Sequence, residues 1–172
     1  MITIELLTEK NFRADSLDCY VRTQQVREVY RRVNGEYTLV ELPYVEDWSL
    51  EKKRQVAQAL SGEDCISYLA LEGNKVVGFI GLKKQLNSGY MILDMMHVSA
   101  GCRGQGLGRA LFQKGMEEAE KAGAKGLYIS ACSSRETIAF YRAMGAALSC
   151  SPWARERASS PCVKENTIRC AG

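Results

Sequence analysis

The sequence predicts an α/β (α+β) fold, in which a mixed, mostly antiparallel sheet is flanked by helices. Apolar runs at residues 66–71 and 75–82 are separated by a Glu-Gly-Asn turn signal, which is typical of an antiparallel hairpin. Over residues 90–131 the apolar spacing changes from that of a strand to that of a helix and back, and such a crossover joins parallel strands. The 172 residues, of which 46% are hydrophobic, suit a single domain over residues 1–172.

The first third of the chain has a less regular pattern. Residues 2–7 predict a short strand. Residues 12–33 predict an interrupted helix, because apolar side chains recur there at helical spacing before the turn signal at Asn34-Gly35. Residues 37–45 are rich in β-formers and predict either a strand or an extended loop.

Clearer start and stop signals follow from Ser49 onward. Ser49 can cap a helix that runs to about Leu60, where a Ser-Gly pair ends it. A turn signal at residues 87–89 separates the hairpin described above from a long third strand at residues 90–98. These three consecutive strands are therefore expected to be antiparallel to one another.

The next elements form the crossover. Residues 108–122 have an apolar face at helical spacing, and Gly115 within that face would let the helix approach the sheet closely. Residues 127–131 predict a strand parallel to the one at residues 90–98. A capping box at residues 133–136 predicts the start of a helix that runs to Met144.

Composition excludes several classes of function. The 23 Lys and Arg against 20 Asp and Glu leave a net charge of +3, which is too small to favour nucleic-acid binding. No apolar stretch approaches the roughly 18 residues of a membrane span, and Glu5 follows the start too closely for a secretory signal. The seven cysteines form no CxxC pair and there is one histidine, so no zinc site is expected and free thiols favour the cytoplasm.

The most informative segment is residues 98–109, VSAGCRGQGLGR, which joins a predicted strand to the start of a helix and contains four glycines. Glycines let backbone N–H groups turn inward, and the helix dipole favours an anion, so a phosphate or pyrophosphate is the expected ligand. A dinucleotide fingerprint fails, because Arg109 or Leu111 stands at its third glycine. A P-loop fails too, because Leu107-Gly108 replaces its Lys-Ser/Thr pair.

The pattern R-x-x-G-x-G fits this loop when it is read from Arg103 to Gly108, and it resembles the acyl-CoA loop of the GNAT superfamily of N-acetyltransferases. Downstream, TIAFYRAMG at residues 137–145 is similar to that family's AI-x-FY-x-x-x-G helix. The resemblance implies a GNAT-like sheet whose central parallel pair splays at the acyl-CoA site. It also implies a terminal pair of antiparallel strands, for which residues 146–150 and 163–170 are the candidates.

The resemblance implies roles for particular residues. The CoA pyrophosphate would be held in the glycine loop by Arg103, Gly104, Gln105, Gly106, Leu107, Gly108 and Arg109. The main chain of Met96, His97 and Val98 would pair with the pantetheine arm, and Ser134 would reach that arm as well. Tyr141 would face the thioester sulfur, and no metal is implied.

The implied reaction is direct attack of a primary amine on the thioester of acetyl-CoA. Tyr141 would protonate the leaving thiolate, because a phenol keeps its proton at neutral pH. For the base, Asp94 is preferred to His97, since alternation along a strand places Asp94 on the same face as Met96 and Val98. The acidic and aromatic cluster at residues 46–48 could receive a cationic amine.

Two readings of the function stay open at this point: an acetyl-CoA-dependent N-acetyltransferase and a non-catalytic acyl-CoA-binding regulatory module. Residues 1–62 are expected to form the substrate side, residues 63–145 the acetyl-CoA-binding core and residues 146–172 the terminal strands and tail. The sequence leaves the acceptor open between a small-molecule amine, such as a polyamine or an antibiotic, and a peptide amine, such as a protein N-terminus. It leaves a homodimer open as well.

Overall fold

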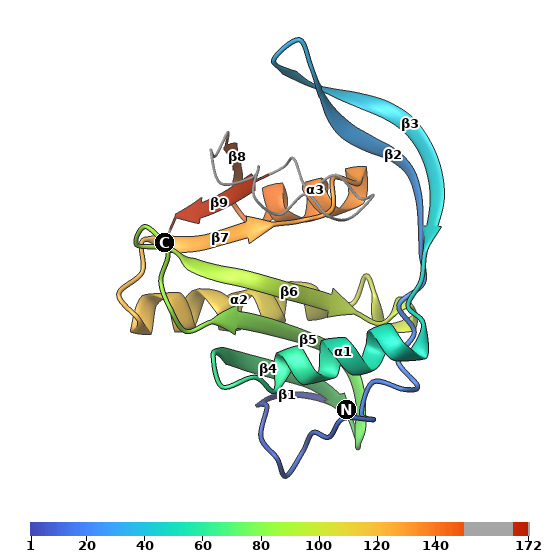
Figure 1. The fold of residues 1–172 in the computed structure, drawn as a ribbon, viewed down its shortest axis with the longest axis vertical. Helices are drawn as coiled ribbons and strands as arrows, with labels where there is room; N and C mark the ends of the chain where they lie inside the picture. Colours follow the sequence, from blue (N-terminus) through green and yellow to red (C-terminus); the bar gives the residue numbers. More distant parts are fainter. Residues whose placement is uncertain (150–166, 172) are drawn as a thin grey trace.

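The computed structural model describes residues 1–149 and 167–171, and these residues form a mixed sheet, a separate hairpin and three α-helices (Figure 1). The elements are β1 (Ile2–Leu6), β2 (Gln24–Val33), β3 (Glu36–Glu46), α1 (Leu50–Leu60), β4 (Cys65–Glu72), β5 (Lys75–Lys83), β6 (Met91–Val98), the 3-10 helix η1 (Ala100–Cys102), α2 (Leu107–Lys121), β7 (Gly126–Ser130), α3 (Arg135–Ala143), β8 (Ala147–Ser149) and β9 (Thr167–Ala171). No described helix combines the length and the apolar character that crossing a bilayer requires.

The sheet confirms the predicted fold class. Its strand order is β1-β4-β5-β6-β7-β9-β8 in the described part of the chain. β4, β5 and β6 are antiparallel in sequence order, and β6 and β7 are the parallel pair that the crossover predicts. The expected terminal pair is confirmed too, since β8 and β9 are antiparallel, and β9 lies between β7 and β8. Residues 150–166 and 172 lie outside the described residues.

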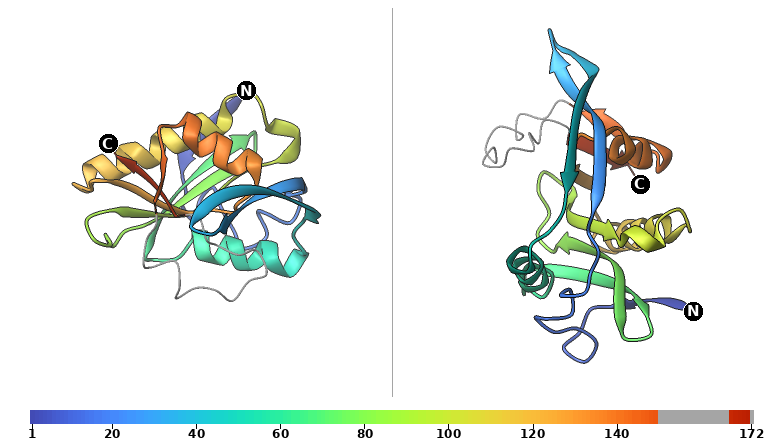
Figure 2. Two further views of the ribbon diagram at one scale, coloured as in Figure 1. Left: turned by 90° about the horizontal axis from the view of Figure 1, so that it is seen from above. Right: turned by 90° about the vertical axis from the view of Figure 1, so that its right-hand side faces the viewer.

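Helices cover both faces of the sheet. α1 lies on one face, and α2 and α3 lie on the other (Figure 2). The larger core lies under α2 and α3 and includes Leu82, Leu111, Leu127 and Ile138. The smaller core lies between α1 and the other face of β4 and β5, and it includes Val56 and Leu60 of α1 with Leu69 and Phe79 of the two strands.

Gly115 has the role that its place in the apolar face of α2 predicts. A Cβ atom there would lie 2.8 Å from Ile80 Cδ1 and 3.4 Å from Leu127 Cδ1. We expect Gly115→Leu to lower the free energy of unfolding by about 2 kcal/mol, because the added carbons must displace buried side chains. Urea unfolding checks this, with Gln113→Leu on the exposed side of α2 as the control. Equal loss in both variants would contradict the close approach.

The predicted helix over residues 12–33 is wrong. Residues 24–33 form β2, which pairs with β3 in a long curved hairpin that rises past α3 (Figure 1). The register of the hairpin shifts between Val26 and Glu28, where β3 has one residue more than β2, next to Pro43. The buried residues of β2, Val26 and Val29, are three positions apart, which is the spacing of a helix face, and this explains the wrong prediction.

The start of α3 differs from the predicted capping box by one residue. Ser134 is the N-cap, and its Oγ accepts a hydrogen bond from Thr137 N at 3.2 Å. Ser133 is engaged elsewhere, since its carbonyl accepts from Tyr30 N at 2.8 Å and its hydroxyl accepts from Arg31 at 3.0 Å. Ser133, which the sequence pattern predicts as the N-cap, therefore binds the hairpin instead.

Candidate active site

The site begins where β6 and β7 separate. The two strands pair from Met91 to Leu93 and from Leu127 to Ile129, and beyond these residues they diverge. β6 also contains a bulge, because Leu93 faces Leu82 and Met95 faces Gly81, which leaves Asp94 as the extra residue. A cavity of about 910 Å³ fills the resulting gap. Its walls come from the hairpin base (residues 21–28 and 44–46), α1, β6, the glycine loop, β7 and α3.

The glycine loop forms one end of this cavity. Gly104 and Gly106 have φ angles of +77° and +79°, which glycine adopts without strain, and Gly106 is the N-cap of α2. No side chain caps the first turn of α2, so its N–H groups are available to an anion. Arg103, Gly104, Gly106, Gly108 and Arg109 line the cavity. Gln105 and Leu107 do not; Gln105 donates back to Gly101 O, and Leu107 packs into the core.

Gly108 is explained by packing. A Cβ atom at this position would lie 3.2 Å from Phe140 Cε2, so the first turn of α2 approaches the α3 side chain closely. Arg103 secures the loop to its surroundings, since its Nε donates to Val98 O at 3.1 Å and its Nη2 to Arg22 O at 3.5 Å.

Tyr141 lies deeper in the same cavity, beside Leu93, Met96 and Ile129 in its lining. As predicted, it shares the buried face of α3 with Ile138, and it is 5% exposed. Burial raises the pKa of its phenol, so the hydroxyl keeps its proton at neutral pH and well above it. In the described part of the chain the Tyr141 hydroxyl has no hydrogen-bond partner, so it is free to donate into the gap.

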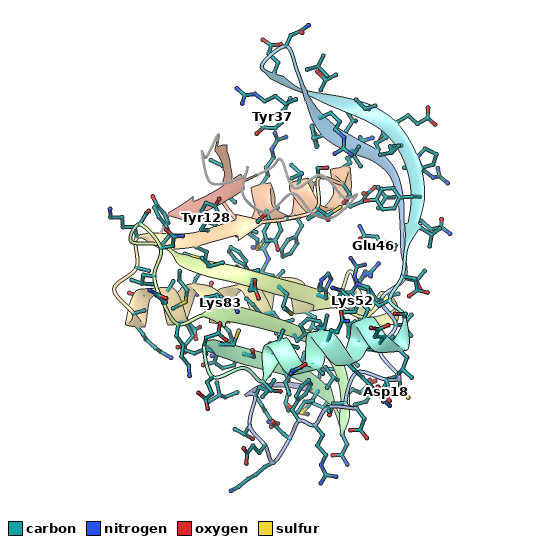
Figure 3. All side chains as sticks on the ribbon, viewed as in Figure 1. Asp18, Tyr37, Glu46, Lys52, Lys83 and Tyr128 are labelled. Atoms are coloured by element: carbon teal, nitrogen blue, oxygen red, sulfur yellow. The ribbon has the colours of Figure 1, made fainter. Side chains whose placement is uncertain are left out.

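The predicted facing of Asp94 is wrong. Met96 and Val98 pack against the core under α2, whereas Asp94 Oδ2 lies 3.6 Å from Lys83 Nζ. A Cβ atom at Gly81 would lie 2.9 Å from Leu60 of α1, so Gly81 faces α1. Lys83 stands two residues further along β5 and therefore lies on the same face (Figure 3). The bulge breaks the alternation on which the prediction relied. Asp94 still lines the cavity, from its α1 side.

His97 has a neutral imidazole. It packs edge-on to Trp48 with ring centres 4.7 Å apart, and its other aromatic neighbour is Phe79 at 5.6 Å. Burial lowers the pKa of His97 well below 6.5, and the nearby Arg22 and Arg103 lower it further. Met96, His97 and Val98 all line the cavity, as a strand that pairs with a pantetheine arm would.

Ser134 lies outside the cavity. It is fully buried, and its hydroxyl is engaged by Thr137 and by Gln24 Nε2 at 3.4 Å. The structure thus gives this residue a capping role and a contact with β2, and it does not bring its hydroxyl to the other predicted cofactor-binding residues.

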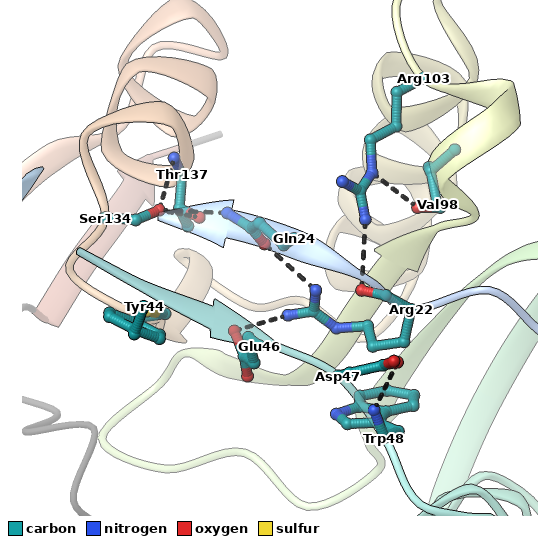
Figure 4. A network of polar contacts seen from close by, with 11 residues as sticks. Arg22, Gln24, Tyr44, Glu46, Asp47, Trp48, Val98, Arg103, Ser134 and Thr137 are labelled. Carbon is teal, nitrogen blue, oxygen red and sulfur yellow. Dashed lines mark hydrogen bonds and ion pairs between the residues drawn. The ribbon is translucent and has the colours of Figure 1, made fainter. Parts of the chain in front are cut away.

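The hairpin base supplies cavity residues that the sequence pattern did not reveal, namely Arg22, Gln24 and Gln25, and it also supplies Glu46 of the predicted acidic and aromatic cluster. It also bridges the two sides of the gap. On one side, Ala100 N donates to Val21 O at 3.1 Å; on the other, Glu28 forms an ion pair with Arg135 at 2.6 Å (Figure 4 shows the network between them). The predicted helix over residues 12–33 conceals Arg22, Gln24 and Gln25, because their position depends on contacts with distant segments and no local signal indicates it.

Among the described cysteines, Cys19, Cys65, Cys102 and Cys132 form no disulfide, and Cys132 Sγ lies 3.2 Å from the Tyr44 hydroxyl. The side chains of the other three cysteines lie outside the described residues. Within the described residues, no group of three or more His, Cys, Asp or Glu side chains is arranged to hold a metal ion.

Comparison with known proteins agrees with this architecture. A protein named as a streptothricin acetyltransferase from Bacillus anthracis str. Ames, in complex with acetyl coenzyme A, is 21% identical with a TM-score of 0.68, covering 98% of this chain and 97% of that chain. A nourseothricin acetyltransferase is 18% identical with a TM-score of 0.68 (98% and 95% covered). The ribosomal-protein-S18-alanine N-acetyltransferase from Escherichia coli is 19% identical with a TM-score of 0.61 (98% and 91% covered). At these identities the likeness concerns the fold.

The family is identified from the amino-acid sequence. No curated protein matches it. A model of the acetyltransferase (GNAT) family matches residues 25–146, a span that contains the bulged strand, the glycine loop and Tyr141. The chain therefore belongs to the GNAT family of acetyltransferases and is an N-acetyltransferase.

Proposed function

We propose that this enzyme acetylates a primary amine that reaches the thioester from the α1 side of the sheet. The observation that carries the proposal is the single cavity that extends from the glycine loop to Tyr141 and continues to the hairpin base and α1. With the pyrophosphate on the N–H groups that begin α2, the pantetheine arm would lie along Met96–Val98, and its sulfur would end near Tyr141. The remaining part of the cavity, between α1, the hairpin base and Asp94, is left for the acceptor.

In the proposed reaction the amine nitrogen attacks the thioester carbon directly. The C–N bond forms, the C–S bond breaks, and the CoA thiolate takes the proton of the Tyr141 hydroxyl. The surplus proton of the attacking nitrogen passes to the Asp94 carboxylate, which lines the cavity on the acceptor side. Tyr141 and Asp94 then return to their starting states by proton exchange with water.

Release of CoA thiol from acetyl-CoA in the presence of a panel of primary amines tests the proposal. The acceptor is a small-molecule or peptide amine, so the panel includes alkylamines, amino acids and short peptides. Amine-dependent release, with the acetylated product identified by mass spectrometry, is the expected result. Tight binding of acetyl-CoA without release for any class of amine would contradict it.

Asp94→Asn is expected to lower kcat by about 10–100-fold, within the range of a positioned base, and to leave acetyl-CoA affinity nearly unchanged. Asp64→Asn is the matched control, because Asp64 also pairs with Lys83, at 2.9 Å, but is 70% exposed and lies outside the cavity. Steady-state kinetics decides between the two. An equal loss in both variants would show that Asp94 acts through its pairing with Lys83 and does not serve as the base.

A further inference from the structure

The acidic and aromatic cluster at the end of β3, which the sequence presents as a receptor for a cation, is already filled by Arg22 (Figure 4). The Arg22 side chain is 4% exposed, and its Nη2 lies 2.9 Å from Glu46 Oε2. Its Nη1 donates to Gln24 Oε1 at 3.1 Å, and the guanidinium carbon lies 5.3 Å from the centre of the Trp48 ring. The protein's own guanidinium thus takes the place that an ammonium group of a substrate would take.

Two other carboxylates near the acceptor end are also engaged. Asp94 is paired with Lys83, and Asp47 accepts a hydrogen bond from the backbone N–H of Trp48. By contrast, Lys52 on α1 lines the cavity, and its ammonium group has no ion pair or hydrogen bond within the described residues (Figure 3).

The charged groups that act on His97 at this end are positive. Besides burial, the causes that lower the pKa of His97 are Arg22 and Arg103, and no carboxylate opposes them. A second ammonium group on an acceptor would meet Arg22 and Lys52, while two of the lining carboxylates, Glu46 and Asp94, are already in ion pairs, which leaves Glu136 on the α3 side. A carboxylate on the acceptor would meet an unpaired ammonium group.

We propose, on the basis of the proposed function, that the acceptor is a primary amine that also carries a carboxylate, and that Lys52 binds this carboxylate. Arg22 disfavours a second ammonium group on the acceptor, because its guanidinium already lies over the Trp48 ring and pairs with the Glu46 carboxylate. Diamines and polyamines are disfavoured acceptors of this enzyme.

Three amines with the same four-atom chain and different terminal charge test the proposal: 4-aminobutanoate, 4-aminobutanamide and 1,4-diaminobutane. With acetyl-CoA saturating, kcat/KM should fall in that order, by at least about 5-fold from the anion to the cation. Added salt should reduce the difference, because the pairing is partly exposed to solvent. Equal values or the reverse order would overturn the proposal and leave acetyl transfer itself standing.

Lys52→Glu should reverse the order, so that the diamine becomes the best of the three. Lys10→Glu is the matched control; it makes the same change of charge in an exposed loop outside the cavity and should keep the wild-type order. If both variants keep the order, or both change it alike, Lys52 is not the binding group and the proposal fails. If none of the three amines releases CoA while acetyl-CoA binds, the proposal fails too, and the broader amine panel then decides on acetyl transfer.

Discussion

Tyr141→Phe should lower kcat by about 10²–10³-fold and leave the fold and the acetyl-CoA affinity nearly unchanged. The phenyl ring keeps the contacts with Phe112 and Phe140, whose ring centres lie 6.0 and 5.2 Å from that of Tyr141. What is lost is a proton donor that burial keeps protonated and that has no other hydrogen-bond partner within the described residues. The effect should therefore fall on the step in which the thiolate leaves.

The pH dependence separates this role from packing. The loss should shrink at high pH, where a thiolate leaves without needing a proton. Tyr68→Phe serves as the control, because Tyr68 donates to Glu118 at 2.7 Å and lies outside the cavity, so its removal should leave kcat unchanged. A Tyr141→Phe enzyme with wild-type kcat at every pH would mean that Tyr141 only packs and that water supplies the proton.

Gly106→Asp should weaken acetyl-CoA binding by at least about 100-fold, as measured by calorimetry. The added carboxylate would stand at the N-cap of α2, beside the N–H groups that receive the pyrophosphate, and two negative groups a few ångströms apart repel each other by several kcal/mol in a partly buried site. Gly108→Asp is expected to abolish binding as well, but its Cβ would also press on Phe140, so Gly106 gives the cleaner measurement.

Gly106→Asn is the matched control for this loss. Asn and Asp have nearly the same shape, and both tolerate the positive φ of this position better than other residues do. The Asn variant should therefore keep most of the affinity that the Asp variant loses. An equal, large loss in both variants would mean that loop conformation dominates, and unchanged affinity in a folded Asp variant would remove the loop from the binding site.

Sequence reasoning succeeded where the signal is local. The hairpin of β4 and β5, the crossover through α2 and the glycine loop are each set by residues that are neighbours in the chain. Tyr141 could be placed as well, because helical spacing fixes its face relative to Ile138.

Prediction from the sequence failed where contacts between distant segments determine the local structure. Alternation along β6 places Asp94 on the wrong face, because the bulge arises from the register between β5 and β6 and the spacing within β6 alone cannot show it. The apolar spacing of β2 predicts a helix, because contact with Ser133 and Ser134 buries Val29 together with Val26. Arg22 and Lys52 come to one cavity from different elements, and nothing in the spacing of their neighbours indicates that meeting.

The place of β9 bears on how the protein is synthesised. Residues 167–171 insert between β7 and β8, yet the ribosome delivers them after every other described strand. Until then the sides of β7 and β8 that face β9 carry unpaired backbone groups, and such edges pair readily with other chains. Nascent chains arrested before residue 167 should therefore aggregate more than chains that include β9, and a soluble fusion partner would protect the growing chain better at the N-terminus, where it is made first.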